Sequence, residues 1–347
     1  MACLRDGFNR PIQYLRVSVT DRCNFRCFYC MPQQGVQNRR HSEILTYEEI
    51  ALIVRAAAGL GLSKVRITGG EPLVRLGIVD LVRMLAEIPG IDDLAMTTNG
   101  FLLATHARAL KEAGLRRVNV SLDTLKPDRF ARITGAPALK RVIAGIEEAR
   151  EAGLRPIKIN VVALRGVNDD ELADFAAVTI EKEWNVRFIE LMPLGQTAAW
   201  GSGSYLPVDE IKEIIGALGP LEPDAPDEPK PDAADQRGEP ERSALPTTIG
   251  PARYCRLPGA KGTIGFISPV SDHFCFNCNR LRLTADGRLR PCLLWEDEID
   301  LRTPLREGAT LEDVKGLLTH AAAIKPEGHR LSERIVPVGR VMSEIGG

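Results

Sequence analysis

The sequence has little of several features that would place it in a special class of protein. Only 8 of its 347 residues are cysteines and 5% are aromatic, so it is not a secreted disulfide scaffold. No apolar run approaches the ~18 residues that cross a bilayer, and the first residues lack the apolar core of a signal peptide. We therefore expect a cytoplasmic protein without membrane contact.

An excess of charge of one sign is also lacking. The chain has 45 basic and 46 acidic residues, a formal net charge of −1, so no overall field favours nucleic acid or an anionic membrane. The motif G-x-x-x-x-G-K-[ST] is absent, which excludes nucleotide binding by a P-loop. A site for an anion must therefore be local, built from cations that the fold brings together.

The composition that remains is that of a globular enzyme, with 44% hydrophobic residues and a mean hydropathy of −0.09. Up to about residue 218, short β-branched runs alternate with amphipathic stretches, a pattern typical of βα units. Strands are predicted at Leu15–Thr20, Lys64–Thr68, Asp93–Thr97, Arg117–Leu122, Pro156–Val162 and Val186–Leu191. Helices are predicted near 46–58, 76–88, 101–113, 137–152, 170–183 and 207–218.

Six consecutive βα units favour an α/β fold with a partial (β/α)6 TIM-type barrel over an open, doubly wound sheet. We expect the barrel to span residues 1–218 and the acidic, proline-rich stretch 219–250 to form a flexible insert. Residues 251–347 would form a small C-terminal unit packed on the barrel. In that unit, short strands are predicted at Lys261–Ser268 and Leu281–Thr284, and a helix at 311–323.

Three cysteines stand together directly after the first predicted strand. Cys23, Cys27 and Cys30 lie in CNFRCFYC with C-x3-C-x2-C spacing, so one loop can aim three thiolates at one centre. A [4Fe–4S] cluster normally takes four cysteines, so three would leave one iron open to a small molecule. The alternative is a zinc site completed by a histidine such as His41.

A second trio lies in the C-terminal part. Cys275, Cys278 and Cys292 have C-x2-C-x13-C spacing with no evident fourth ligand. His273 and Cys255 could complete a zinc site here. A second iron–sulfur centre with an open iron would instead bind a substrate nitrogen or oxygen.

Basic residues recur at strand positions. Arg280 and Arg282 alternate along a predicted strand, which places both guanidinium groups on one face, where they suit a polyphosphate or dicarboxylate. Arg16, Arg66 and Lys158 lie on other predicted strands, where a buried cation costs desolvation unless an anion meets it. Together they predict a strongly anionic substrate. Surface ion pairs on an edge strand are the alternative.

The first cysteine trio and one other segment are similar to segments of a known group of enzymes. CNFRCFYC after a strand resembles the cluster-binding loop of the radical S-adenosylmethionine (SAM) enzymes, and Gly69-Gly70-Glu71-Pro72 resembles their segment that contacts the SAM amino group. The resemblance implies that SAM chelates the open iron through its amino and carboxylate groups. It also implies that an electron from the reduced cluster cleaves SAM to a 5′-deoxyadenosyl radical.

Three further features are similar to one family of these enzymes, the GTP 3′,8-cyclases, also called molybdenum cofactor biosynthesis protein A. These features are the pair of cysteine trios, the run FCFNCNRLRLTADGRLRPCL at 274–293 and the ending RVMSEIGG. The similarity fails only across 219–250. It implies two [4Fe–4S] clusters and a radical that removes hydrogen from C3′ of GTP, after which C3′ attacks C8 of guanine. This reaction is the first step of molybdenum cofactor biosynthesis.

The resemblance also assigns residues and partners. The SAM-contacting positions are matched by Tyr29, Gly70, Ser121 and Met192. The GTP-contacting positions are matched by Arg16, Arg66, Thr97, Lys158, Arg280, Leu281 and Arg282. Gly346 and Gly347 would reach into the active site in a supporting role, and the open iron of the second cluster would bind the guanine. The implied partners are GTP, a flavodoxin-type electron donor, a second copy in a homodimer and cyclic pyranopterin monophosphate synthase as recipient of the product.

Two other functions remain open at the level of sequence. A peptide-modifying radical SAM enzyme with an auxiliary cluster would leave the Arg280–Arg282 pair and the Gly-Gly end unexplained. A zinc-stabilised binding module without catalysis would be colourless, whereas two [4Fe–4S] clusters give a brown protein with ~8 iron atoms per chain.

Overall fold

The computed structural model describes residues 3–32, 34–37, 39–194, 201–223, 250–333, 335–337 and 339–346. Most of the predicted insert at 219–250, and Gly347, lie outside these ranges. The strands are β1 (Tyr14–Ser18), β2 (Lys64–Thr68), β3 (Asp93–Thr98), β4 (Arg117–Ser121), β5 (Ile157–Ala163), β6 (Trp184–Glu190), β7 (Glu222–Pro223), β8 (Arg253–Arg256), β9 (Thr263–Ile267), β10 (Arg280–Leu283), β11 (Arg288–Arg290) and β12 (Ile299–Asp300). The α-helices are α1 (Tyr47–Gly59), α2 (Ile78–Ala86), α3 (Leu103–Glu112), α4 (Pro127–Thr134), α5 (Leu139–Glu151), α6 (Leu172–Glu181), α7 (Val208–Gly216), α8 (Arg302–Arg306), α9 (Leu311–Ala323) and α10 (Met342–Ile345).

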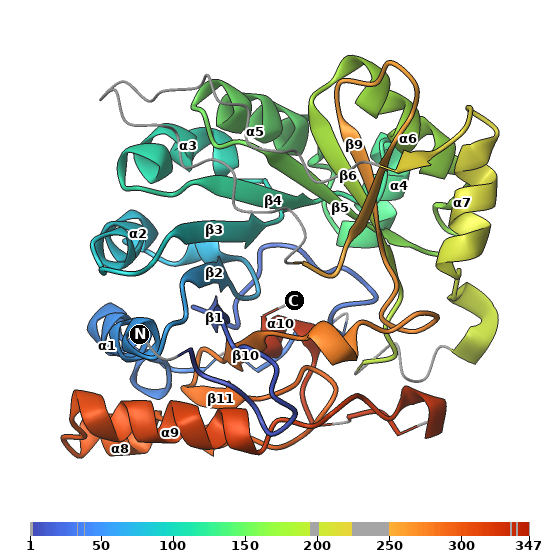
Figure 1. The fold of residues 1–347 in the computed structure, drawn as a ribbon. Helices are drawn as coiled ribbons and strands as arrows, with labels where there is room; N and C mark the ends of the chain where they lie inside the picture. Colours follow the sequence, from blue (N-terminus) through green and yellow to red (C-terminus); the bar gives the residue numbers. More distant parts are fainter. Residues whose placement is uncertain are drawn as a thin grey trace, which may run out of the picture.

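The six predicted strands form one parallel run. Strands β1 to β6 follow one another in the sheet in their order along the chain, with helices on their outer side (Figure 1). A doubly wound sheet would reverse its strand order at a switch point, so the partial barrel is confirmed and the alternative is wrong. Apolar side chains of β1 and β2, such as Leu15, Val17 and Ile67, face the helices and are fully buried.

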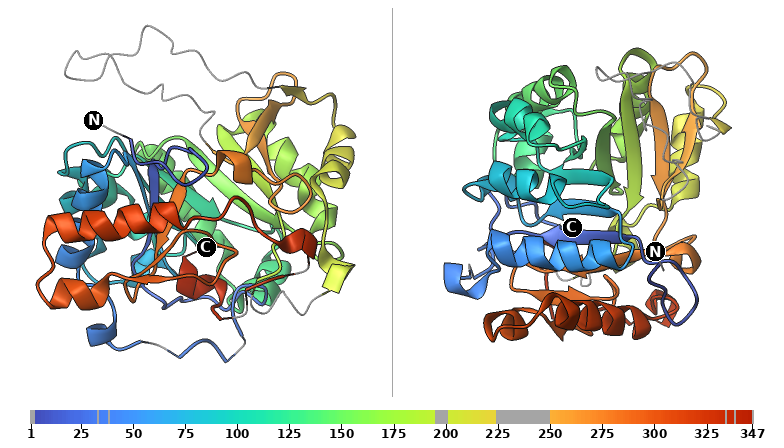
Figure 2. Two further views of the ribbon diagram at one scale, coloured as in Figure 1. Left: turned by 60° about the horizontal axis from the view of Figure 1, so that its bottom comes forward. Right: turned by 60° about the vertical axis from the view of Figure 1, so that its left-hand side comes forward.

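The C-terminal part extends the sheet at both edges. Strand β10 pairs parallel with β1, and β9 pairs parallel with β6. Backbone N–H and C=O groups at the open edges of a partial barrel need partners, and these strands supply them. The C-terminal residues are therefore partly built into the barrel sheet rather than only packed on it, and α9 lies along α1 (Figure 2). The predicted boundaries between the units stay a prediction.

Several short elements are absent from the sequence-based prediction. Helix α4 is inserted between β4 and α5, where Pro127 occupies the first turn and Gly135 closes the helix with a φ of 75°. Strands β7, β8, β11 and β12 span two to four residues each, too few for a periodicity to be read. Among the described helices, none is long and apolar enough to cross a membrane.

Candidate active site

Cations line the inner face of the barrel. The register places Arg282, Arg16 and Arg66 side by side on β10, β1 and β2. Lys158 of β5 and Arg187 of β6 face the same interior. Burial and the neighbouring guanidinium groups lower the pKa of Arg66 to about 10 and hold the pKa of Lys158 well below its usual range. The inner face therefore carries concentrated positive charge, held at a cost in free energy.

These side chains surround one cavity of about 2050 Å³, whose described lining includes 17 lysines and arginines but four aspartates and glutamates. Two of the four acids are paired, Asp93 with Arg117 and Glu183 with Arg155. A typical small-molecule pocket has roughly 300–1,000 Å³. The cavity therefore has room for two ligands and a surplus of positive charge.

Several polar atoms of the lining are buried without a hydrogen-bond partner among the described residues. They include Tyr14 Oη, Arg66 Nε, Thr97 Oγ1, Arg187 Nε and Thr263 Oγ1. A buried donor left unpaired costs roughly 1–3 kcal/mol. The lining is thus short of acceptors, and a ligand rich in phosphate oxygens would supply them.

The first cysteine trio lies at the carboxyl end of the barrel strands, in the loop after β1. Phe25 anchors this loop, with its ring edge-on to Phe101 and Phe130 at 5.7 and 5.6 Å between centroids. The Tyr29 hydroxyl donates to Asp123 Oδ2 at 2.5 Å, and Asp123 in turn accepts from the Val162 N–H at 2.9 Å. The loop is therefore tied to the ends of β4 and β5.

The thiols of this trio influence one another. Burial and the charges of Cys30, Asp123 and Cys23 raise the pKa of Cys27 well above its usual range. Burial, Cys23 and Asp123 raise the pKa of Cys30 to about 12. Three buried thiolates without a cation are thus unfavourable, which fits a site where an iron–sulfur cluster neutralises them.

The segment Gly69-Gly70-Glu71-Pro72 packs directly against the cluster loop. The Gly70 N–H donates to Thr20 O at 2.7 Å and the Glu71 N–H donates to Arg22 O at 2.8 Å. A Cβ on Gly70 would lie 2.5 Å from Arg22 O, so no larger residue fits without backbone movement. Glycine is required here because the backbone of the cluster loop approaches so closely.

Glu71 joins this segment to the end of β3. It is fully buried and accepts from the Leu73 N–H at 3.0 Å, from Thr98 Oγ1 at 2.7 Å and from the Asn99 N–H at 2.6 Å. Burial raises its pKa to about 7, against the opposing effect of these three hydrogen bonds. Nothing in the sequence marks Glu71 as a brace, because the two partners at the end of β3 are 27 and 28 residues away.

We expect Glu71→Gln to weaken both the fold and SAM binding. The amide would turn an N–H toward the donors that now meet a carboxylate, which leaves donors unsatisfied at a cost of roughly 1–3 kcal/mol. Denaturant unfolding should show that loss, and calorimetry should show weaker SAM binding. Glu112→Gln, at an exposed position on α3, is the matched control and should change neither. Equal stability of the two variants would contradict the brace.

The second trio lies on the opposite side of the same cavity lining. Cys275 is in a short 3-10 helix, Cys278 precedes β10, and Cys292 follows β11. Burial opposes ionisation of Cys278, but Lys325 and Arg280 lower its pKa to about 7. No three His, Cys, Asp or Glu side chains in the described ranges, His41, His273 and Cys255 included, converge closely enough to hold a single metal ion.

The C-terminal tail enters the barrel. Arg282 Nη1 donates to Gly346 O at 3.1 Å, and the Ser343 N–H hydrogen-bonds to the Cys30 sulfur. Gly346 has a φ of 79°, and a Cβ there would lie 2.7 Å from Thr68 Cγ2. The tail is therefore in contact with the first trio and with Arg282, while Gly347 lies outside the described residues.

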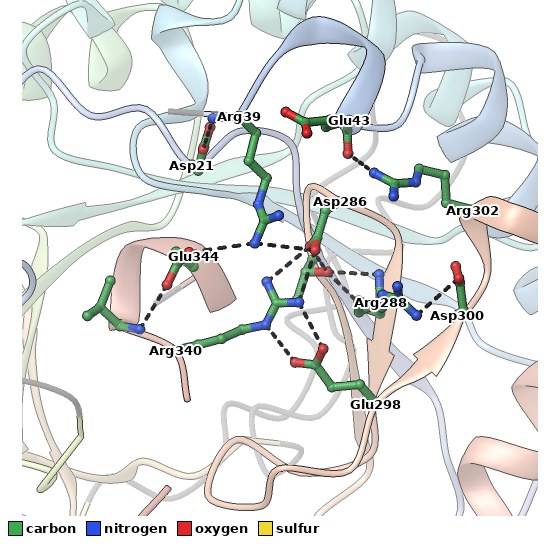
Figure 3. Close-up of polar contacts among 12 residues, drawn as sticks. Asp21, Arg39, Glu43, Asp286, Arg288, Glu298, Asp300, Arg302, Arg340 and Glu344 are labelled. Carbon is green, nitrogen blue, oxygen red and sulfur yellow. Dashed lines mark hydrogen bonds and ion pairs between the residues drawn. The ribbon is translucent and has the colours of Figure 1, made fainter. Parts of the chain in front are cut away.

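A network of charges anchors this tail (Figure 3). Arg340 donates to Asp286 at 3.1 and 3.0 Å and to Glu298 at 2.7 and 2.8 Å. Burial alone would lower the pKa of Arg340, but these two carboxylates raise it. Arg39 lies 3.4 Å from Asp286 and 3.7 Å from Glu344 of α10, and its N–H donates to Asp21 at the start of the cluster loop.

The cavity brings together most of the residues that the sequence singled out. All six trio cysteines line it, as do Tyr29, Gly70, Ser121, Met192, Arg16, Arg66, Thr97, Lys158, Arg280 and Arg282. Among the described residues of this set, Leu281 and Gly346 do not line it. Strand alternation turns the Leu281 side chain into the hydrophobic core, where it is 0% exposed. The lining also includes Lys64, Arg117 and Arg187, which the sequence analysis missed. Each lies two residues before another residue of the same strand, namely Arg66, Asn119 and Ile189. Strand alternation places such pairs on one face, and this spacing could have identified them.

Comparison with known proteins agrees with this geometry. Residues 17–178 match the radical SAM superfamily, and residues 184–331 match the family Molybdenum Cofactor Synthesis C. The chain is 51% identical to GTP 3′,8-cyclase of Pelotomaculum thermopropionicum over 99% of this chain and 100% of the relative. It is 50% identical to GTP 3′,8-cyclase of Moorella thermoacetica over the same shares.

Solved structures show the same fold at low identity. SuiB of Streptococcus suis bound to S-adenosylmethionine has a TM-score of 0.58 at 14% identity and covers 93% of this chain and 77% of its own. SuiB bound to the precursor peptide SuiA has a TM-score of 0.57 at 14% identity over 93% and 73%. These similarities confirm the barrel fold but give no information about the substrate.

Proposed function

The chain belongs to the GTP 3′,8-cyclase family of radical SAM enzymes, and from that premise we propose how its residues perform the reaction. It converts GTP to (8S)-3′,8-cyclo-7,8-dihydroguanosine 5′-triphosphate, the first step of molybdenum cofactor biosynthesis. The reaction removes the C3′ hydrogen and joins C3′ to C8. The observation that carries the assignment of residues is the single cavity that both cysteine trios and the arginine-rich strands line.

Cys23, Cys27 and Cys30 would hold the first [4Fe–4S] cluster. When bound, such a cluster with one open iron supplies the electron that cleaves SAM and so yields the hydrogen-abstracting radical. The protein contributes a buried loop fixed by Phe25 and Tyr29, and the carboxyl ends of β2, β4 and β6 beside it. Gly70, Ser121 and Met192 at those strand ends, with Tyr29, are the proposed SAM contacts.

The triphosphate of GTP would lie against the inner cations. Burial lowers the pKa of Arg16, Arg66, Lys158 and Arg282, so an anion beside them would offset the cost of their charge. Arg280 lines the same cavity. Thr97 Oγ1 and Arg66 Nε are among the buried atoms without a hydrogen-bond partner in the described part of the chain, and phosphate or ribose oxygens would satisfy them. Arg187 and Lys64 face the same space and extend this proposed set.

Cys275, Cys278 and Cys292 would hold a second [4Fe–4S] cluster whose open iron faces the guanine. Support comes from the position of this trio in the same cavity as the arginine pair that follows Cys278. The base would then be fixed at one end and the triphosphate at the other. Such fixation holds C3′ and C8 in near-attack contact, which is the protein's share of the catalysis.

GTP binding at alkaline pH should take up a proton at Lys158. Burial and the charges of Arg187, Arg117 and Arg66 lower the pKa of Lys158 in the free protein, and a triphosphate beside it would raise that pKa again. GTP affinity should therefore fall as pH rises from the lowered pKa toward the usual lysine value of about 10.4. Calorimetry in two buffers of different ionisation enthalpy measures the uptake, since above pH 8 the phosphates no longer titrate.

Lys158→Met should abolish this proton uptake and weaken GTP binding. Lys182→Met is the control, because Lys182 is exposed and pairs with Glu147 outside the cavity. Identical proton uptake by wild type and Lys158→Met would show that another group titrates.

The proposed function is tested anaerobically with reconstituted protein, a strong reductant and SAM, incubated with GTP, ATP or no nucleotide. Mass spectrometry should detect 5′-deoxyadenosine and a GTP-derived isomer only with GTP. Formation of 5′-deoxyadenosine without dependence on GTP would still support radical SAM chemistry, but it would contradict GTP as the substrate. A flavodoxin-type donor, a homodimer and product transfer to cyclic pyranopterin monophosphate synthase stay expectations for separate tests.

A further inference from the structure

We propose that Lys325 supplies the fixed positive charge that balances the second cysteine trio, and that it raises the reduction potential of the cluster held there. The inference rests on the proposed second cluster. Lys325 follows α9 and is 3% exposed. A buried ammonium group is costly unless an anion lies beside it, so its surroundings identify its partner.

The ammonium group of Lys325 donates to one cysteine of the trio and to two backbone carbonyls beside it. Lys325 Nζ donates to Arg280 O at 2.9 Å and to Pro291 O at 2.6 Å, and it hydrogen-bonds to the Cys278 sulfur. Arg280 is two residues after Cys278, and Pro291 directly precedes Cys292. One side chain therefore links the segment after Cys278 to the segment before Cys292.

No carboxylate neutralises this charge. Within the described ranges, Lys325 forms no ion pair with an aspartate or glutamate, and its contacts are two carbonyls and a thiol. Arg10 offers a contrast: it donates to Cys275 O at 2.6 Å, but it is paired with Asp6 at 2.6 Å. The pair of Arg10 and Asp6 adds no net charge, whereas Lys325 adds a full one. The Cys278 sulfur, a thiolate when it holds the cluster, would then be its counter-ion.

The cations beside the two trios differ in burial. At the first trio, Arg26 donates to Cys23 O at 2.6 Å from an exposed position, where water screens its charge, whereas Lys325 is buried beside the second trio and meets the Cys278 sulfur. Charge and hydrogen bonds to the sulfurs set the potential of an iron–sulfur centre. A positive charge beside the second trio favours the more reduced state, so it shifts the potential upward.

The test is a redox titration of the reconstituted full-length protein, followed by electron paramagnetic resonance. Addition of SAM perturbs the signal of the first cluster and so separates the two signals. In Lys325→Met and Lys325→Gln, we expect the one-electron reduction of the second cluster to become about tenfold less favourable, a shift of about 59 mV to more negative potential. The first cluster should not shift. Lys315→Met is the matched control and should leave both potentials unchanged, because Lys315 of α9 pairs with Glu312 and does not line the cavity.

Lys325→Gln retains a donor for the carbonyls, so it separates charge from hydrogen bonding if Lys325→Met loses iron. An unchanged second potential in Lys325→Gln, with both clusters present, would overturn the inference. If both neutral variants lose the second cluster while Lys325→Arg keeps it, the requirement for charge is supported. Loss in all three variants would overturn it. A wild-type protein that holds only one cluster would instead overturn the proposed second cluster, and this inference with it.

Discussion

Cys27→Ala is expected to abolish formation of both 5′-deoxyadenosine and the GTP-derived product, and to lower the iron content from ~8 to ~4 atoms per chain. Three thiolates already leave one position of a four-ligand cluster open, so a trio reduced to two has no means of holding it. Cys27 is also the trio member whose thiol lies among Cys23, Cys30 and Asp123. Iron analysis and mass spectrometry of the reaction mixture measure the two losses.

Cys255→Ala is the matched control. Cys255 is 8% exposed and packs in the hydrophobic core, outside both trios. Its replacement should leave the iron content at ~8 and turnover within about twofold of wild type. Retention of full turnover by Cys27→Ala, or loss of iron by Cys255→Ala, would contradict the ligand assignment.

Deletion of Gly346 and Gly347 is expected to lower cyclisation by about 100-fold or more while leaving ~8 iron atoms per chain. The carbonyl of Gly346 accepts from Arg282, one of the proposed triphosphate ligands, and its Cα lies against Thr68 and Ser18 at the ends of β2 and β1. Without the tail, Arg282 loses this restraint and the interior admits water. Misplacement of a reacting group by about 1 Å is enough for a loss of 10²-fold.

Two substitutions refine this prediction. Gly346→Ala should act in the same direction, because its φ of 79° and the 2.7 Å approach to Thr68 Cγ2 exclude a Cβ. Gly339→Ala should be neutral, since a Cβ there meets only Glu296 Oε1 at 3.8 Å. Product formation measured by mass spectrometry, alongside iron content, distinguishes the variants. A truncated enzyme with full turnover would refute the supporting role of the tail.

The contacts of Arg340 also show how the C-terminal tail is held in place. It holds the chain before α10 through Asp286 and Glu298, as Figure 3 shows, and it does not line the cavity. Its anchoring contacts come from the hairpin of β10 and β11 and from the segment before β12. The position of the tail is therefore decided by residues some 40 to 54 positions away in the chain.

Much of the candidate site follows from local sequence. Cys23, Cys27 and Cys30 are spaced for one loop, and the pair Gly69-Gly70 directly follows a predicted strand. The cations on β1, β2 and β5 are visible because strand alternation places every second residue on one face. These features are short-range, so the sequence alone predicts them.

What the sequence by itself determined is the set of chemical groups: two cysteine trios, the glycine pair, alternating arginines and six βα units. The tertiary structure alone decided which side chains hold those groups in place. Glu71 braces the end of β3, Arg340 anchors the tail, and Lys325 meets the second trio. Each is an ordinary charged residue in the sequence. Its role arises from burial and from partners distant in the chain, which local periodicity cannot encode.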